Sequence, residues 1–413
     1  MERLLIKGGR IVDPANRFDA VRDLRLHAGV VAEIGEHLDA QSGEVEIDAA
    51  GAIVAPGFID MHVHLREPGY PQKETIATGT EAAVRGGFTG VACMPNTNPA
   101  LDSPPVLDSL REQIVRDARC RVYPVAAMTV GRLGAQPCDY DALTRAGAVA
   151  FSDDGDTIGD AAVALEAARR ASVVAGVFIS HCEDPSFGGA FGRPAAAEDV
   201  AVARDLVIAQ TTKKNWHLAH LSTRCALELL RFARGRGAPV TCEVTPHHLF
   251  FSSESARELG GAARVNPPLR EVDDCAALRE AVRDGTIDAF ASDHAPHTQA
   301  EKSGDGAAAA PGFTGLEVAV GAYALALPDL ALSRFVELLS TNPARILGVR
   351  GGTLARGAPA DVTIFAHRKW RVDPSAFASK GKTTPFAGRE LPVRILATIV
   401  GGELRYRATE IAA

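Results

Sequence analysis

Short apolar runs recur along the middle of the chain, and stretches with helical spacing separate most of them. Eight of these runs are rich in β-forming residues, and they cover residues 58–65, 87–97, 121–129, 147–155, 177–184, 216–223, 239–249 and 287–297. Strands that alternate with helices predict parallel pairing through crossovers, and eight such units close a (β/α)8 barrel. The sequence therefore predicts an α/β protein with a TIM-type barrel over residues 58–348.

The intervening stretches are rich in Ala, Leu, Arg and Glu, which favour helices. The clearest of them cover residues 75–87, 160–176, 197–210 and 225–237. The interval 133–146 offers only a short helix. The crossover between the third and fourth runs is therefore the weakest part of the predicted barrel.

The two ends of the chain have a different texture from the middle. Short alternating runs, separated by Gly, Pro and Asn, cover residues 4–13, 21–35 and 43–57 and return over 348–373 and 391–408. Such runs indicate a small antiparallel β unit. We expect a β-sandwich domain built from both ends, residues 1–57 and 349–413.

Polar residues stand where several of the predicted barrel strands should end. His62 and His64 are one residue apart, so both side chains should lie on the same face of their strand. Such a pair alone is more often two core histidines than two metal ligands. In five of the eight runs, however, His or Asp stands within a residue or two of where the strand should end, and the C-terminal ends of barrel strands share one face. The residues that should converge there are His62, His64, Asp154, His181, His220 and Asp293.

These six candidate ligands contain no cysteine and suit Zn²⁺. Six protein ligands exceed the need of one tetrahedral ion, so two ions with Asp154 between them are favoured over one. The first ion would take His62, His64 and Asp293, and the second His181 and His220. Two such ions lower the pKa of a bridging water, and the resulting hydroxide can attack a polarised carbonyl.

Asp293 has a second predicted task. A carboxylate beside the attacking hydroxide can take its proton and deliver it to a leaving nitrogen. We therefore expect Asp293 to be the general base and then the general acid in the hydrolysis of an amide.

The order of these residues resembles the amidohydrolase superfamily, and within it the bacterial type I dihydroorotases. The shared pattern is His-x-His on the first strand, a bridging ligand on the fourth, His on the fifth and sixth, and Asp on the eighth. Asp153 and Asp154 are adjacent, and the resemblance selects Asp154. It implies reversible conversion of L-dihydroorotate to N-carbamoyl-L-aspartate, a step of pyrimidine biosynthesis.

The resemblance also implies a site for the substrate's carboxylate. Arg66 of HVHLREPG, Asn96 of MPNTNP and His297 of DHAPH match the family's carboxylate-binding residues. An Arg fork suits such a bidentate partner. The full implied substrate set is His64, Arg66, Asn96, Asn266, His297, Pro311 and Gly312.

Three features depart from the family's pattern. No Lys stands at the fourth-strand position, so Asp154 must bridge. The segment after residue 184 is shorter than in close relatives. Pro311 stands where relatives often have Phe before the substrate-contacting Gly312.

Other histidines near these motifs are expected to have structural roles. His217 and His294 should point away from the metal ligands if their strands are regular. His247 and His248 lie near the site face after a proline, and loop packing is the expected role for both.

Composition limits the choice of partners. The net charge of −7, without a cluster of Lys and Arg, argues against nucleic acid or an anionic membrane. Seven cysteines without a CxxC pair indicate reduced thiols, and the N-terminal residues do not suggest a targeting segment, so a cytoplasmic protein is expected. We expect a small-molecule substrate and a homo-oligomer, and the resemblance adds a complex with aspartate transcarbamoylase.

Two other functions stay open at this point. The same metal chemistry could act on a hydantoin or on allantoin, although Arg66, Asn96, Asn266 and His297 argue against it. Some dihydroorotase-like chains have lost metal ligands and serve as structural partners of aspartate transcarbamoylase. All six ligand positions are filled here, which disfavours a purely structural role.

Overall fold

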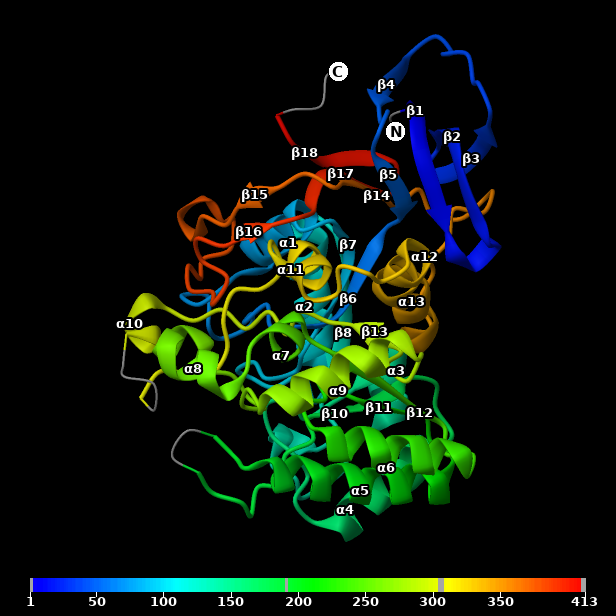
Figure 1. Cartoon of the computed structure of the whole chain (residues 1–413). Coiled ribbons are helices and arrows are strands. Elements are labelled where there is room, and N and C mark those ends of the chain that lie inside the picture. The colour runs from blue at the N-terminus through cyan, green and yellow to red at the C-terminus, as the bar shows by residue number, and fades with distance from the viewer. Residues whose placement is uncertain (1–2, 190–191, 304–307, 410–413) are drawn as a thin grey trace.

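A nearly closed barrel of eight parallel strands forms the centre of the computed structural model, which describes residues 3–189, 192–303 and 308–409 (Figure 1). The strands follow one another around the barrel in chain order: β6 (Phe58–Val63), β7 (Phe88–Cys93), β8 (Arg121–Ala126), β9 (Ala150–Phe151), β10 (Val177–Ser180), β11 (Trp216–Leu218), β12 (Val240–Val244) and β13 (Ala289–Phe290). Each of the eight predicted runs contains one strand, so the predicted barrel is confirmed.

The barrel closes where its first strand meets the segment that follows its last. Val63 of β6 forms an isolated parallel bridge with His294, and the backbone N–H of His64 donates to the carbonyl oxygen of His294 at 2.8 Å. Two metal-ligand candidates, His64 and Asp293, are therefore next to the seam.

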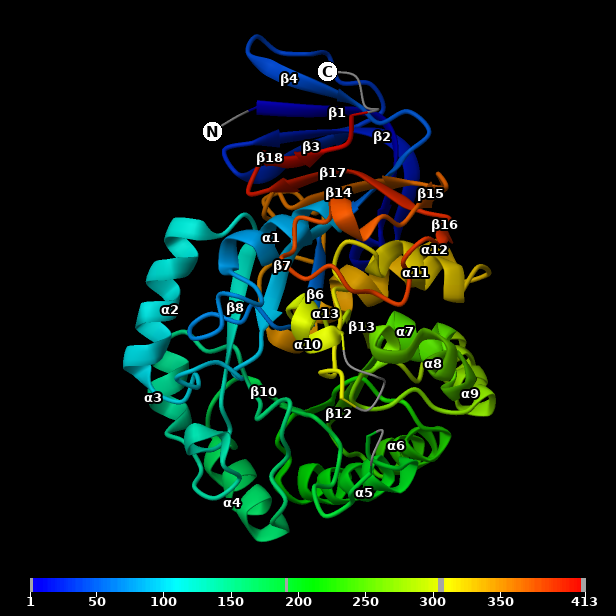
Figure 2. The same cartoon turned by 90° about the vertical axis from the view of Figure 1, so that its left-hand side faces the viewer.

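Helices surround the barrel (Figure 2). The larger ones are α1 (Ile76–Arg85), α2 (Pro104–Asp117), α3 (Tyr140–Arg145), α4 (Ala161–Ala171), α5 (Ala195–Thr212), α6 (Arg224–Gly235), α9 (Val272–Arg283) and α11 (Ala319–Ala326). The four clearest helical stretches of the sequence overlap α1, α4, α5 and α6, and the weak interval 133–146 contains the short α3. Hydroxyl or carboxylate caps mark several starts, such as Thr75 before α1 and Asp160 before α4.

Shorter elements complete the barrel's ends. They are α7 (Pro246–Phe250), α8 (Ser253–Leu259), α10 (Gln299–Lys302), α12 (Leu332–Val336), α13 (Asn342–Leu347), three 3₁₀ turns at Val130–Arg132, Gly260–Ala263 and Pro374–Ala376, and a π-helical turn at Glu337–Thr341. Within the described residues, no helix is long and apolar enough to span a membrane.

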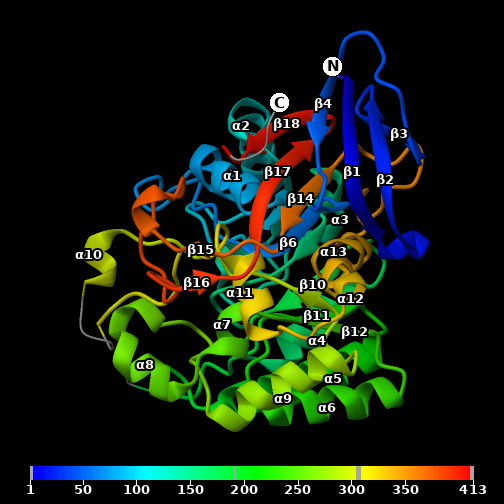
Figure 3. The same ribbon diagram turned by 45° about the horizontal axis from the view of Figure 1, so that its top comes forward.

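Both ends of the chain contribute to a second sheet of eight strands (Figure 3). Its strands are β1 (Arg3–Asp13), β2 (Phe18–His27), β3 (Val30–Gly35), β4 (Glu44–Asp48), β5 (Ile53–Pro56), β14 (Val362–Ala366), β17 (Arg394–Val400) and β18 (Glu403–Arg407), with a 3₁₀ turn at Pro14–Asn16 between β1 and β2. They run in the order β18-β17-β14-β5-β1-β2-β3, with β4 also beside β1. The sheet has its own apolar core, to which both ends contribute, for example Leu4, Leu26, Ile364 and Ile399.

This terminal sheet is mixed rather than purely antiparallel. The pairs of β1 with β2 and of β2 with β3 are antiparallel, but β1 pairs in parallel with both β4 and β5. After β3 the chain crosses to the edge of β1 that lies opposite β2. There β4 and β5 run in the same direction as β1, so both pairings are parallel. The alternation in the sequence predicted strands but could not give their direction.

One stretch of the C-terminal part leaves this sheet. β15 (Trp370–Arg371) and β16 (Glu390–Leu391) pair with each other, and Phe377 and Phe386 between them pack with Phe251 and Phe313 of the barrel end. We propose a division into a barrel at 58–348 and a terminal β unit from both ends, with residues 370–391 reaching from that unit onto the barrel.

Candidate metal centre

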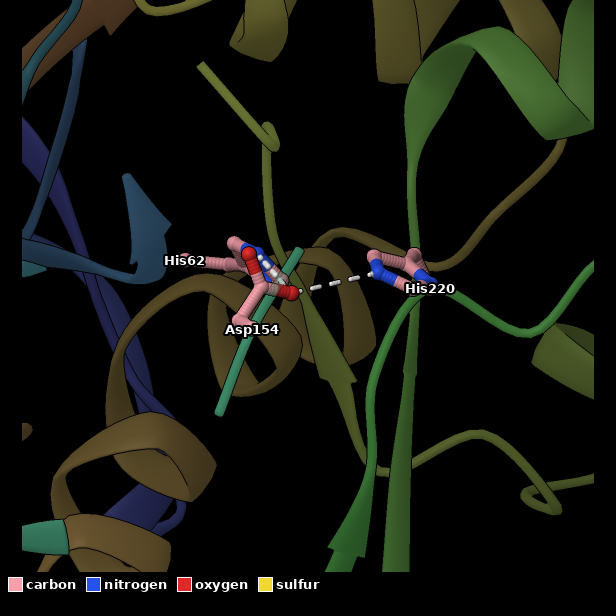
Figure 4. Close-up of side chains that lie close together, drawn as sticks. All are labelled: His62, Asp154 and His220. Carbon is pink, nitrogen blue, oxygen red and sulfur yellow. Dashed lines mark ion pairs between the residues drawn. The ribbon is translucent and has the colours of Figure 1, made fainter. Parts of the chain in front are cut away.

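Asp154 lies among four imidazoles at the C-terminal ends of the barrel strands. Its Oδ1 atom is 3.1 Å from His62 Nε2 and 3.7 Å from His220 Nε2 (Figure 4). His181 Nδ1 lies 3.5 Å from the same oxygen, and His64 Nε2 lies 3.4 Å from Oδ2. The carboxylate is thus placed between all four candidate histidines.

Asp293 completes the cluster on one side. Its Oδ1 atom is 3.2 Å from His64 Nε2 and 3.7 Å from His62 Nε2. His62, His64 and Asp293 form one group whose ligand atoms lie within 4.8 Å of one another, and His62, Asp154 and His220 form a second. The structure therefore brings all six candidate ligands together. His62 is common to both groups, and His181 Nδ1 lies 3.0 Å from His220 Nε2.

These residues fit a divalent cation. In the described part of the chain, His62 Nε2 and Asp154 Oδ1 are buried and make no hydrogen bond. A buried polar atom without a partner costs about 1–3 kcal/mol, and a metal ion would remove that cost. Imidazole nitrogens with carboxylate oxygens are the donors that zinc and similar ions prefer.

The pKa shifts within the cluster also favour a bound cation. Burial alone would raise the pKa of Asp154, but the charge of His62 and the neighbouring imidazoles of His181 and His220 hold that pKa well below its usual value. Burial alone would lower the pKa of His181, but the neighbouring carboxylates of Asp154 and Glu183 raise it to about 10. His181 therefore keeps a proton at neutral pH, and a bound cation would displace it.

A second layer of carboxylates fixes the ligand rings, and sequence reasoning missed it. Glu243 of β12 accepts hydrogen bonds from His62 Nδ1 at 2.9 Å and from His217 Nε2 at 3.1 Å. Glu183 Oε2 lies 3.1 Å from His181 Nε2, which leaves His181 Nδ1 toward Asp154. Such partners orient metal-binding imidazoles. A glutamate inside the apolar run VTCEV was the available signal, because a buried Glu is rare unless it is paired.

The two adjacent aspartates after β9 point in different directions. Asp153 Oδ1 accepts from the backbone N–H groups of Met128 and Thr129, at 2.8 and 3.0 Å, and its Oδ2 accepts from the Thr129 hydroxyl at 2.5 Å. Asp153 therefore supports the neighbouring loop, and Asp154 is the carboxylate that faces the histidines.

Three residues of the site have left-handed backbone conformations. The φ angles of Arg66, His220 and Asp293 are 63°, 35° and 49°. A non-glycine residue in this region costs on the order of 1–3 kcal/mol, and it persists only where its surroundings hold it. The strand ends are therefore bent to aim these side chains inward.

The predicted carboxylate-binding residues lie beside the candidate metal ligands. Arg66 is buried, its Nη2 atom is 3.3 Å from His297 Nε2, and its Nε–H donates to the Pro296 carbonyl at 3.2 Å. Asn96 Oδ1 is 2.8 Å from His64 Nδ1. Arg66, His297 and Asn96 thus form a polar edge next to His64.

Three further residues were predicted to contact the substrate: Gly312, Pro311 and Asn266. Both backbone groups of Gly312 are engaged, since its N–H donates to the Arg264 carbonyl at 2.8 Å and its carbonyl accepts from Lys302 Nζ at 2.7 Å. Pro311 is exposed, and its carbonyl lies 2.9 Å from His297 Nε2. Asn266 is half-buried, outside the six-ligand cluster.

His247 and His248 are both buried near the cluster. His248 donates from Nε2 to the Pro267 carbonyl at 2.9 Å, whereas neither ring nitrogen of His247 has a hydrogen-bond partner among the described residues. The His247 ring packs edge-on against Phe313. Packing was the role expected for both, and it stays a prediction.

Comparisons with known proteins agree with the geometry. The family model described as Dihydro-orotase-like matches residues 51–226, and that of the Amidohydrolase family matches residues 194–405. The dihydroorotase of Pelotomaculum thermopropionicum is 45% identical over 97% of this chain and 98% of its own length. The dihydroorotase of Aquifex aeolicus is 39% identical over 98% of this chain and 100% of its own.

Solved structures share the fold. The L-hydantoinase of Arthrobacter aurescens superposes with a TM-score of 0.89 at 24% identity, over 100% of this chain and 98% of that one. The D-hydantoinase of a Thermus species superposes with a TM-score of 0.86 at 24% identity, over 99% and 96%.

The adjacent aspartates provide a matched test of the metal centre. Asp154→Ala should lose most of its bound metal, because it removes the carboxylate placed among all four histidines. Asp153→Asn should keep its metal and lose only stability, since its hydrogen bonds lie in the neighbouring loop. Elemental analysis of the purified variants measures both, and equal metal loss in the two would contradict the assignment.

Proposed function

The chain belongs to the dihydroorotase family of amidohydrolases, and we propose that it catalyses the reversible hydrolysis of the ring amide of L-dihydroorotate to N-carbamoyl-L-aspartate. In the reverse direction, this reaction closes the ring in pyrimidine biosynthesis. The observation that carries the proposal is the cluster of six metal-ligand candidates with the buried Arg66 beside it. The cluster could hold the metal that activates a water for attack on the amide, and Arg66 could bind the carboxylate of this substrate.

We propose Zn²⁺ as the metal, with two ions favoured over one. His62, His64 and Asp293 would hold the first ion, and His181 and His220 the second, with Asp154 shared. The distances of Asp154 to all four histidines support this shared position. When bound, such ions lower the pKa of water to near neutrality and polarise a carbonyl.

Asp293 is the proposed proton carrier. Burial alone would raise its pKa, but the hydrogen bond from His64 and the charge of His62 lower it, so Asp293 is ionised at neutral pH and can accept a proton. Its Oδ1 is the atom nearest His62 and His64, which leaves Oδ2 for the proton. Asp293 would take this proton from the attacking water and give it to the ring nitrogen as the carbon–nitrogen bond breaks.

Arg66 is the proposed anchor of the substrate's carboxylate. Burial, followed by the charges of Arg66 and Lys73, lowers the pKa of His297 to about 3, so this imidazole is neutral. Arg66 therefore carries the positive charge, and His297 and Asn96 add polar contacts.

The remaining residues of the proposed site would surround the substrate's ring. His64 and Asn96 would border the ring, and Asn266 would reach its edge. Gly312 has a φ of 113°, and a Cβ there would lie 2.6 Å from Ala295 Cβ. With both of its backbone groups engaged, Gly312 and the neighbouring Pro311 would shape the site rather than bind the ring strongly.

Partners and compartment are also proposals. The resemblance to type I dihydroorotases suggests a homo-oligomer and a complex with aspartate transcarbamoylase, and gel filtration of the chain alone and with that enzyme tests both. The seven cysteines are free thiols, which supports the reducing cytoplasm as the compartment.

The proton-carrier role predicts a selective loss of turnover. Asp293→Asn keeps one oxygen that can face the metal but cannot carry the proton, so kcat should fall by about 100-fold or more while most of the metal stays bound. Steady-state kinetics with elemental analysis measures both. Asp160→Asn is the control, because Asp160 caps α4 on the surface and Asn caps helices equally well. Near-normal turnover in Asp293→Asn would refute the role.

The carboxylate anchor predicts the substrate preference. L-dihydroorotate should be hydrolysed far better than dihydrouracil, which has the same ring without the carboxylate. Arg66→Ala should raise KM for L-dihydroorotate and reduce this preference, because it removes the charge that only one of the two compounds uses. A chain that prefers dihydrouracil, hydantoin or allantoin would support the other cyclic amides instead.

A further inference from the structure

Glu74 is a fully buried carboxylate outside the metal cluster, and it joins three separate segments of the chain. Five groups donate to it: the hydroxyls of Thr78 and Ser379, the backbone N–H groups of Thr75 and Lys380, and the imidazole of His294. Thr75 and Thr78 follow β6, His294 follows β13, and Ser379 and Lys380 belong to the segment that reaches from the terminal sheet onto the barrel. No part of the proposed mechanism uses this residue.

The hydrogen bond between Glu74 and His294 has a defined direction. His294 Nδ1 accepts from the backbone N–H groups of Gly315 and Leu316, at 3.1 and 3.3 Å. The proton of the neutral ring must therefore lie on Nε2, which donates to Glu74 Oε2 at 3.3 Å. Both ring nitrogens are engaged, so the side chain of His294 is fixed at each end.

His294 follows Asp293 directly and lies at the barrel seam. Its carbonyl accepts from the His64 N–H at 2.8 Å, and its own N–H donates to Ser292 Oγ at 3.0 Å. Asp293, between Ser292 and His294, has the left-handed φ of 49°. Such a conformation needs neighbours that hold it. Glu74, acting through the His294 ring, is one of those restraints.

The segment 379–383 closes this arrangement from outside the barrel. A Cβ on Gly381 would lie 2.3 Å from Thr314 Oγ1 and 2.8 Å from Pro296 Cβ, so only glycine fits against these two loops. The N–H of Thr314 donates to the Thr383 carbonyl at 2.9 Å. Ser379 and Lys380 bind Glu74 from the same segment.

We propose that Glu74 is a positioning residue for the reaction: through His294 it holds Asp293 in the conformation that proton transfer requires, and Ser379 of the C-terminal segment completes this support. The inference rests on the proposed function, because it gives Glu74 a role in that same turnover. It also gives residues 379–383 a part in catalysis, although they lie outside the barrel sequence.

Glutamine is an informative replacement for Glu74. A carboxylate is an acceptor at both oxygens, and here both face donors. The glutamine amide has nearly the same shape but turns an NH₂ group toward one set of donors. Glu74→Gln therefore disturbs the hydrogen bonds without leaving a cavity.

The first test is Glu74→Gln, with kcat, KM for L-dihydroorotate, metal content and thermal midpoint measured on the same preparation. Removing a hydrogen-bond partner that lies behind the residues of a metal site typically lowers metal affinity or activity by about 10–100-fold. We expect a loss of that size in kcat, with little change in KM or metal content. A purely structural role would lower the thermal midpoint and leave the kcat of the folded protein unchanged. That result would overturn the inference.

The second test asks whether Glu74 acts through Asp293. In an Asp293→Asn background, Glu74→Gln should cause little further loss, because residues that act as one unit are not additive. An equal further loss in that background would contradict the inference.

Two serines of one segment provide a gentler pair of variants if Glu74→Gln does not fold. Ser379→Ala removes a donor from the oxygen that also binds His294, and should lower kcat. Ser375→Ala is the matched control, because Ser375 is exposed and donates to Asp373. Equal kcat in the two variants would contradict the inference. A wild-type chain inactive on L-dihydroorotate would remove the proposed function and this inference with it, whereas an active wild type with unaffected variants overturns the inference alone.

Discussion

The structure depends on one electrostatic constraint: a buried carboxylate, Asp154, lies within 3.7 Å of four imidazoles that come from three other barrel strands. No short stretch of chain could build this cluster, so the barrel must close to within hydrogen-bonding distance before the ligands meet. The bond between the His64 N–H and the His294 carbonyl at the seam provides that closure. The left-handed conformations of His220 and Asp293 then turn their side chains inward.

Buried charge at this density is tolerated because each charge has a partner. Glu243 lies between His62 and His217, and burial is outweighed by these two hydrogen bonds, which lower its pKa to about 2. Glu183 lies against His181 and within 3.4 Å of Arg193. A lone buried charge would cost several kcal/mol, so these carboxylates keep the imidazoles in place and also compensate their charge. The same logic extends to Glu74 behind His294.

Periodicity in the sequence was sufficient for the barrel and for placing candidate ligands at its strand ends, because the strand ends of a parallel barrel share one face. His62 and His64 could be placed on one side of β6 from spacing alone. Asp154 could be separated from Asp153 only by resemblance, since adjacency says that two side chains diverge but not which one faces inward. The parallel pairing of β1 with β4 and β5, and the packing of residues 370–391 on the barrel, depend on long-range contacts that local patterns do not encode. Glu74 and Glu243 were missed for the same reason, because their partners lie on other strands or loops.

The central claim is that this cluster binds a metal and that the metal supports turnover of L-dihydroorotate. The most direct measurement is the turnover of L-dihydroorotate and of N-carbamoyl-L-aspartate by the purified chain alone, with metal content determined on the same sample before and after chelation. We expect bound divalent metal, turnover in both directions, loss of turnover on chelation and recovery when Zn²⁺ is restored. Turnover that survives complete removal of the metal, or a metal-loaded chain that acts on neither compound, would contradict it.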